Sequence, residues 1–274
     1  MPFTYFAHQV PVLPLKMRAP RRWDGLGLVV GSMLPDLWRI TSGWLFGPGG
    51  MPLWTDGHRL DLIVQNCVIP GYLLTVLLRR WTMPVVPAVL PKGGFLRLRD
   101  YRLLALSHHR WWVTAYSVFV GALTHIVLDA FTHADGFVVE AVPAMSNPLF
   151  SVGGRSVALY KLLQFGGHVF GSIAGAWLLL VISRRKLQWT WHGYATRPPD
   201  PVIEGRGAEI IQGMLAVGTI LATAYGILRV AEGDGGVPGF MAFSCVMILT
   251  VLVAGRVGRR WVQPLPAPGD PLVE

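Results

Sequence analysis

Several stretches of this chain are apolar over lengths that match the thickness of a lipid bilayer. Spanning the hydrocarbon layer takes about 20 predominantly apolar residues. The runs 111–132, 165–183, 208–230 and 237–255 meet or approach that length. Charged residues make up only 14% of the chain, whereas a soluble domain carries about 25%. The sequence therefore predicts an integral membrane protein whose main partner is the lipid bilayer.

Shorter or interrupted apolar segments lie between these runs. Residues 62–78 nearly reach span length but contain Pro70 and Gly71, which predict a kink. Residues 25–40 contain Pro35 and predict a half-span or a helix that ends at Asp36. The expected fold class is all-α: a polytopic membrane helical bundle of about five to seven helices, with a short or re-entrant N-terminal helix.

The domain organisation follows from one change in composition, at "LQWTWHGYATRPPDPVIEGRG". Its proline, glycine and charge content predicts a loop. We therefore expect a motif-bearing membrane domain at residues 1–183 and a loop at 184–207. Two C-terminal transmembrane helices should follow within 208–255, and a proline-rich tail at 256–274. The polar residues inside apolar segments lie almost wholly in the first of these parts.

The net charge of +9 is concentrated at the ends of the apolar runs. Basic clusters occur at 18–22, 79–80, 184–186 and 256–260, the pattern that the positive-inside rule gives to cytoplasmic loops. No basic stripe is interleaved with exposed aromatic residues, so nucleic-acid binding is not expected. Working back from these loops places Asp36, the 56–61 stretch and the end of the 111–132 run on one outer membrane face.

The stretch "GALTHIVLDAFTHADG" carries the strongest sign of chemistry. His125, Asp129 and His133 recur every four residues, so they drift by only about 40° per step around a helix. Imidazole and carboxylate at this spacing can reach one metal ion, and ionisable groups inside a span are costly unless they are paired or metal-bound. The structural alternative is that His125 and Asp129 only pair with each other, while His133 and Asp135 lie in interfacial water.

Further ligand candidates come from distant stretches, and each has a structural alternative. They are Asp36 in "GSMLPDLW", Asp56, His58 and Asp61 in "TDGHRLDL", and His8 in "FAHQV"; Gln164 and His168 in "QFGGHVFG" are cavity candidates. The alternatives are a helix stop at Asp36, a solvated loop and helix N-cap at 55–62, an interfacial His8, and a His168 that packs among glycines. His108 and His109 are expected to be solvated, and His192 is assigned no role.

The order of these motifs resembles a bacterial family of integral membrane proteins of unknown function, the domain-of-unknown-function family numbered four-one-eight-four. The resemblance rests on "MPFTYFAHQ", "GSMLPD", the His-containing loop before the second span, "GALTHIVLDAFTHADG" and "LYKLLQFGGHVFG". This sequence departs from the family pattern in two places. "GHRLDL" lacks the Ser that usually follows the His, and His168 is displaced from its usual position after Gln.

The same motif order is similar to that of the YdjM-type membrane-bound metal-dependent hydrolases. More remotely, His-x-x-x-Asp followed by a further His looks like the zinc-ligand helix of bacterial phospholipase C and nuclease P1. These resemblances imply a ligand set drawn from His8, Asp36, His58, His125 and Asp129, with His133 as a further member. They also imply a location in a cell membrane, the bacterial inner membrane.

Together these patterns predict a metal-dependent hydrolase of a small-molecule or lipid substrate, with phosphoesters as the expected class. A divalent metal, expected to be zinc, would activate water, and Asp36 or Asp135 would act as general base. Two alternatives stay open. One is a non-catalytic scaffold with a structural metal or a hydrogen-bonded polar core, and the other is an ion or proton transport protein.

Overall fold

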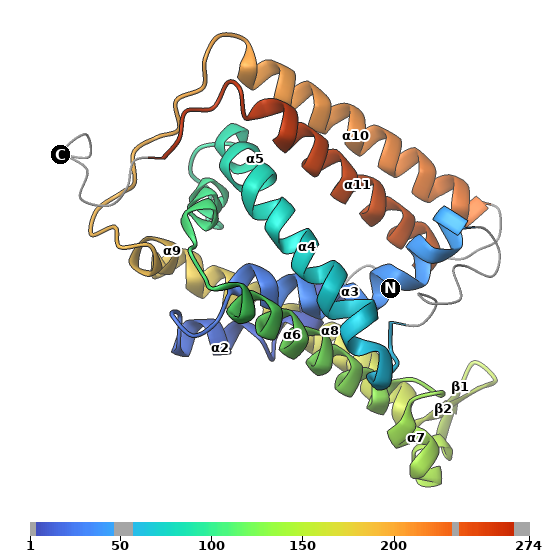
Figure 1. The fold of residues 1–274 in the computed structure, drawn as a ribbon. Coiled ribbons are helices and arrows are strands. Elements are labelled where there is room, and N and C mark those ends of the chain that lie inside the picture. The colour runs from blue at the N-terminus through green and yellow to red at the C-terminus, as the bar shows by residue number, and fades with distance from the viewer. Residues whose placement is uncertain (1–3, 47–56, 232–235, 266–274) are drawn as a thin grey trace.

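The computed structural model describes residues 4–46, 57–231 and 236–265, and these residues are mostly helical (Figure 1). The long helices are α3 (Gly25–Phe46), α6 (Trp111–Thr132), α8 (Leu159–Arg184), α10 (Gly207–Arg229) and α11 (Gly236–Gly258). Short helices connect them: α1 (Thr4–Gln9), α2 (Leu13–Arg18), α4 (Ile69–Leu77), α5 (Met83–Val89), α7 (Phe137–Ala141) and α9 (Leu187–Trp191).

Three helices of the described chain, α6, α8 and α10, are long and apolar enough to cross a membrane. They correspond to the predicted runs 111–132, 165–183 and 208–230, which are thereby confirmed as membrane-length apolar helices. Shorter apolar helical segments lie at Gly25–Leu37 in α3 and at Ala242–Gly258 in α11. A bundle of five to seven spanning helices stays a prediction.

The prolines of the 62–89 segment interrupt regular α-helical hydrogen bonding, but the segment stays helical over most of its length. A 3₁₀ turn at Leu60–Leu62 and a π-helical turn at Val64–Val68 lead into α4, and a second π-helical turn at Leu78–Thr82 leads into α5. Pro70 and Pro84 both lie in the first turn of the helix that follows. A missing N–H costs least there, and the hydrogen-bonding pattern changes at the two π-helical turns. The kink at Pro70 and Gly71 stays a prediction.

Helices α3 and α6 run parallel and in close backbone contact. A Cβ on Gly31 would collide with the Val118 backbone, and one on Gly121 would collide with the Leu28 carbonyl. Small residues let helix backbones approach in this way inside membranes. Because Asp24 also meets Ser117 and Ser32 meets His125, the first half of α3 runs alongside α6 with corresponding levels in contact.

The prediction that a helix ends at Asp36 is wrong. Helix α3 continues to Phe46, with Pro35 inside it. A proline in a helix interior removes only its own N–H bond to the residue four positions back, and helices in membranes tolerate that loss when neighbours pack around it. Asp36 therefore lies in the middle of a long helix, level with the C-terminal half of α6.

The N-terminal segment forms two short helices, where the sequence predicted one short or re-entrant helix, and α1 packs on α8. Beta carbons added to Gly171 and Gly175 would collide with Ala7 and Phe6, so α8 offers α1 a surface without side chains. This contact carries His8 into the interior, where it is 4% exposed.

The predicted loop at 184–207 contains the short helix α9, and the chain after it forms the antiparallel hairpin of α10 and α11 (Figure 1). Val85, Val89, Ile211 and Ala254 form a buried cluster where this hairpin meets α5. A single β-bridge joins Ile203 to Val262. Of the predicted tail, residues 266–274 lie outside the described residues.

A two-stranded antiparallel sheet departs from the predicted all-α class. Strands β1 (Pro148–Val152) and β2 (Arg155–Ala158) form a hairpin that projects beside α7 at one end of the molecule (Figure 1). Gly153 and Gly154 turn the chain with φ of +57° and +76°, values that glycine adopts without strain. The Gly-Gly pair between short apolar stretches is the hairpin signal that the prediction missed.

Candidate metal centre

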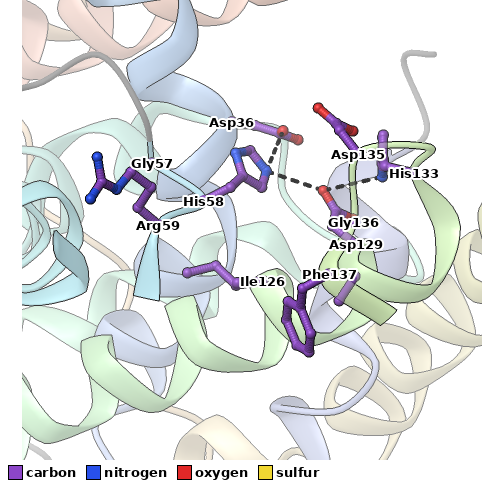
Figure 2. Close-up of a pocket in the computed structure, with 11 residues that line it drawn as sticks. Asp36, Gly57, His58, Arg59, Ile126, Asp129, His133, Asp135, Gly136 and Phe137 are labelled. Atoms are coloured by element: carbon purple, nitrogen blue, oxygen red, sulfur yellow. Dashed lines mark hydrogen bonds and ion pairs between the residues drawn. The ribbon is translucent and has the colours of Figure 1, made fainter. Parts of the chain in front are cut away.

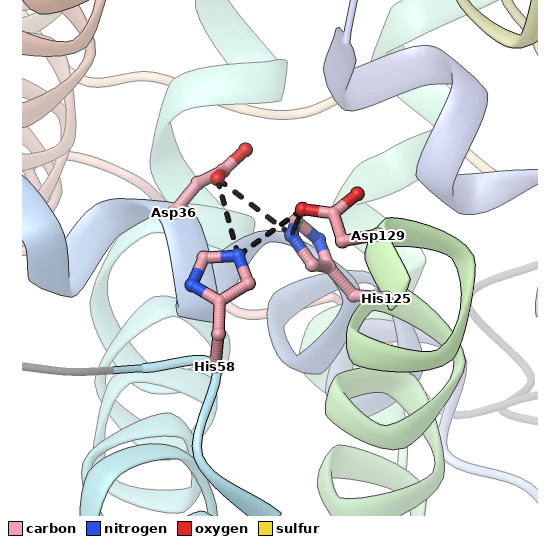
Figure 3. A group of neighbouring side chains, drawn as sticks. All are labelled: Asp36, His58, His125 and Asp129. Carbon is pink, nitrogen blue, oxygen red and sulfur yellow. Dashed lines mark hydrogen bonds and ion pairs between the residues drawn. The ribbon is translucent and has the colours of Figure 1, made fainter. Parts of the chain in front are cut away.

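Four side chains from three separate parts of the fold converge on one point (Figure 3). Asp36 comes from α3, His58 from the loop before α4, and His125 and Asp129 from α6. Each offers one ligand atom, and these four atoms all lie within 4.8 Å of one another. The structure thus contains a possible metal site, although its side chains come from segments that lie far apart along the chain.

The spacing of these atoms fits a single small cation. His58 Nε2 and His125 Nε2 lie 3.1 and 3.3 Å from Asp129 Oδ2. The same two nitrogens lie 3.8 and 3.6 Å from Asp36 Oδ1. An ion held tetrahedrally at about 2.0–2.2 Å from each ligand sets its ligands about 3.3–3.6 Å apart. The four observed separations, from 3.1 to 3.8 Å, include this range of ligand–ligand distances.

His125 is fixed in the form that a metal ligand requires. Its side chain is fully buried, and Nδ1–H donates to the backbone carbonyl of Ser32 at 2.7 Å. The other ring nitrogen, Nε2, faces the carboxylates of Asp36 and Asp129. A ring nitrogen held by a backbone carbonyl, with the other nitrogen directed at the centre, is the usual outer support of a metal-bound histidine.

His58 owes its position to a glycine. A Cβ on Gly57 would collide with the carbonyl of Pro35, so the loop lies directly on α3, one residue before Asp36. Cys67 Sγ also donates to the Gly57 carbonyl at 3.5 Å. No residue pattern indicates that Gly57 and Pro35 touch, because this contact joins distant segments of the chain.

His8 lies beside the four-residue cluster as a fifth member. Its ring stacks on that of His125 with centroids 3.8 Å apart, and its Nε2 lies 3.6 Å from Asp129 Oδ1. Burial lowers the pKa of His8 to about 3. His8 is therefore a neutral imidazole at physiological pH, as a metal ligand must be.

A cavity of about 480 Å³ opens over the cluster (Figure 2). His133 borders it, with Nδ1 3.7 Å from Asp129 Oδ2 and Nε2 3.1 Å from the Gln164 side chain. Asp135 also lines it, beyond the cluster and exposed to solvent. Predicted residues on α6 and after it thus extend from the buried cluster to the cavity mouth.

Two predicted residues stand apart from this group, and a third lies outside the described residues. Asp61 is exposed and pairs with Arg59 at 2.5 Å, so it belongs to the solvated loop rather than to the cavity. His168 is partly buried on α8, and no hydrogen bond or ion pair joins it to the cluster within the described chain. Asp56 lies outside the described residues.

The cavity wall also contains residues that the sequence did not single out. Ile126, Arg59 and Phe137 line it together with the polar groups, and half of the Phe137 surface is exposed. The structural alternative of an isolated His125–Asp129 pair does not describe this arrangement, because Asp36, His58 and His8 lie within reach of the same two residues.

Comparison with known proteins gives one match. The model of the family described as "Domain of unknown function (DUF4184)" matches residues 1–257. No curated protein matches the chain, and no solved structure matches it.

Proposed function

The chain belongs to the DUF4184 family, a domain of unknown function, and on that premise we propose that it is a multi-pass membrane protein that hydrolyses a phosphoester at a divalent metal site. The observation that carries the proposal is the convergence of Asp36, His58, His125 and Asp129 within 4.8 Å. His8 is a neighbouring ligand candidate for the same site.

The donor set favours zinc. Two imidazole nitrogens and two carboxylate oxygens are a combination that Zn²⁺ accepts, in tetrahedral geometry. The two carboxylates balance the charge of a divalent ion, which lowers the cost of holding it among apolar helices. A purely oxygen-binding ion such as Mg²⁺ would leave the two histidines unused.

The cavity supplies room and reactive groups for a substrate. When bound, such a metal polarises a phosphoryl oxygen and lowers the pKa of water that contacts it. Asp36 lies within the ligand cluster, so Asp135 is the better placed acid for the role of general base. Arg59 offers a guanidinium that can pair with phosphate oxygens, and Phe137 and Ile126 provide apolar wall for the rest of the molecule.

A lipid or a small molecule near the membrane is the proposed substrate class. α6, which carries His125 and Asp129, is long and apolar enough to span a bilayer, and its C-terminal end forms the floor of the cavity. The positive-inside pattern puts this end on the outer face. We propose that the protein resides in a bacterial inner membrane and works on that face.

Metal content is the decisive measurement. Protein purified in detergent without chelators should contain about one equivalent of zinc per chain, a stoichiometry that follows from a single four-ligand site. The double variant His125→Ala, Asp129→Ala should lose that metal. Asp61→Asn is the matched control, because it removes an acid from the neighbouring loop without touching the cluster, and it should keep the metal.

Turnover then separates the hydrolase from its rivals. Metal-loaded protein should hydrolyse at least one member of a panel of soluble and lipid phosphoesters, and the double variant should not. Bound metal without turnover on any substrate would favour a structural site in a scaffold. Metal-independent ion flux in reconstituted vesicles would favour transport and contradict the proposal.

A further inference from the structure

A second cavity lies at the opposite end of α6 from the candidate metal site of Asp36, His58, His125 and Asp129. Its volume is about 430 Å³, and it forms where the α2–α3 connection, the segment before α6 and the end of α9 meet. Figure 1 shows α2 and α9 at this end of the molecule, and α7 with the hairpin at the other. Since α6 has 22 residues, the two ends are about 30 Å apart.

The walls of this cavity carry positive charge without a compensating acid. None of the described residues that line it is Asp or Glu, and its cationic side chains are Lys16 and Arg21. Three imidazoles, His108, His109 and His192, complete the polar part of the wall. An adjoining cavity of about 450 Å³ shares Leu106, Ser107 and His108 with it and adds Arg79, Arg80 and Arg259. The pair of cavities thus forms one continuous cationic region.

Lys16 shows most directly that this region lacks an anion. The residue is only 6% exposed, and its Nζ donates to the carbonyls of Pro20 and Trp23 at 2.7 and 2.9 Å. An ammonium group has three N–H donors, so one remains. No ion pair joins Lys16 to a carboxylate within the described chain. The ammonium also lies over the Trp191 ring, 5.4 Å from its centroid. A buried cation whose only partners are carbonyls and a ring is costly, and a bound anion would offset that cost.

The nearby carboxylate is already occupied. Asp24 is 1% exposed and accepts hydrogen bonds from Arg79 and from Thr114 Oγ1. It holds α3 and α6 together, with Ser117 accepting from its backbone N–H at 2.9 Å. Asp24 therefore neutralises Arg79 and leaves the charge of Lys16 and the remaining basic side chains for a ligand.

The polar side chains of the wall are held in place. His192 donates from Nδ1 to the Gln188 carbonyl at 2.7 Å, and its Nε2 lies 3.0 Å from Ser107 Oγ. Burial lowers the pKa of His192, so it is a neutral acceptor for the Ser107 hydroxyl. The cavity is consequently preorganised, which reduces the entropy that a ligand must pay to order it.

Aromatic side chains place this end of the molecule at the level of lipid headgroups. Trp111 and Trp112, at the start of α6, are 70% and 51% exposed, and Trp23 stacks on Tyr116 with ring centroids 5.0 Å apart. Tryptophan and tyrosine collect at membrane interfaces. Basic pockets between helices on the cytoplasmic side bind the phosphates of anionic lipids.

We propose that the cavity lined by Lys16, Arg21 and His108 binds a phosphate group, supplied by the headgroup of an anionic phospholipid of the inner leaflet. This assignment rests on the membrane placement proposed above but not on the metal site. The same phosphate chemistry is available from free phosphate, and the experiment distinguishes the two sources.

The test measures binding to the full-length protein in detergent. Three probes are titrated separately: short-chain phosphatidylglycerol, short-chain phosphatidylcholine and inorganic phosphate. The double variant Arg21→Gln, His108→Gln removes two exposed basic side chains of the wall and keeps Lys16, so folding should survive. Arg22→Gln is the charge-matched control, because Arg22 is exposed next to Arg21 and does not line the cavity.

Phosphatidylglycerol should bind the wild type and Arg22→Gln equally, and the double variant at least about tenfold more weakly, as expected for loss of charge-assisted hydrogen bonds. Inorganic phosphate that binds with the same dependence on Arg21 and His108 would support the phosphate site and assign it to a soluble ligand. Equal binding of both lipids by wild type and double variant would overturn the proposal. Zinc content should be unchanged in all three proteins, so failure here leaves the metal site untouched.

Discussion

The imidazole rings of His8 and His125 lie face to face with their centroids 3.8 Å apart. One ring comes from a six-residue helix near the N-terminus and the other from the middle of α6. Their Nε2 atoms lie against the two different oxygens of Asp129, at 3.6 and 3.3 Å. This stacking contact joins the N-terminal segment to the candidate metal site.

Replacing His8 by phenylalanine separates its packing from its nitrogen. His8→Phe keeps a ring against His125 and removes the Nε2 atom next to Asp129. If His8 supports the metal directly, affinity for zinc should fall by roughly 10–100-fold, while the thermal midpoint of the metal-free protein stays close to that of the wild type. Competition with a chromophoric chelator measures the affinity. Unchanged affinity would remove His8 from the ligand set.

Removal of the metal by a chelator should lower the stability of the protein, and this effect should depend on the four ligand residues. A ligand that binds only the folded state stabilises it, by about 2.7 kcal/mol when present at 100 times its Kd. EDTA should therefore lower the thermal midpoint of the wild type, and zinc should restore it. Asp36→Asn, which removes one charged ligand, should show a smaller shift or none. A midpoint that does not respond to EDTA in either protein would contradict a bound metal.

Gly121→Ala should loosen the contact between α3 and α6. The added Cβ would collide with the Leu28 carbonyl, so the helices must separate slightly, at a cost of about 1–3 kcal/mol. Because Ser32 then moves away from His125, zinc affinity should fall as well. Gly167→Ala is the control, since nothing lies within 4 Å of its added Cβ and alanine favours helix by about 0.5–1 kcal/mol. Equal stability of the two variants would mean that α3 and α6 do not pack as described.

The pH dependence of stability should report the buried ammonium of Lys16. Burial lowers the pKa of Lys16 from 10.5 to about 8, against the opposing attraction of Asp24. Between these values the unfolded chain holds a proton that the folded protein has released, so stability should rise with pH from about 8 to 10. Thermal midpoints of the wild type, compared with those of Lys16→Met over this range, should show the rise in the wild type only. Parallel curves would contradict it.

The sequence was sufficient to predict the residues that recur within one helix. His125 and Asp129 follow from helical periodicity in an apolar run, and α6 begins and ends where that run does. The apolar runs likewise predicted α8 and α10, because bilayer thickness sets a length that composition alone can meet.

Contacts between distant segments were beyond the reach of the sequence. Asp61 and His58 are equally suitable ligands by residue type. Only His58 reaches the cluster, because the neighbouring Gly57 packs directly against the backbone of Pro35. Asp36 was expected at a helix end, and its true place inside α3 depends on packing around Pro35. His192 was assigned no role, but α9 carries it into the wall of the basic cavity.

The parallel packing of α3 and α6 has a consequence for how the protein is made. Two parallel neighbouring helices need a connection that returns to the starting end, and here α4 and α5 provide it. No single helical hairpin therefore contains the whole cluster. As the polypeptide leaves the ribosome, His8, Asp36 and His58 emerge well before His125 and Asp129. The cluster can therefore form only after α6 has been made and has packed beside α3.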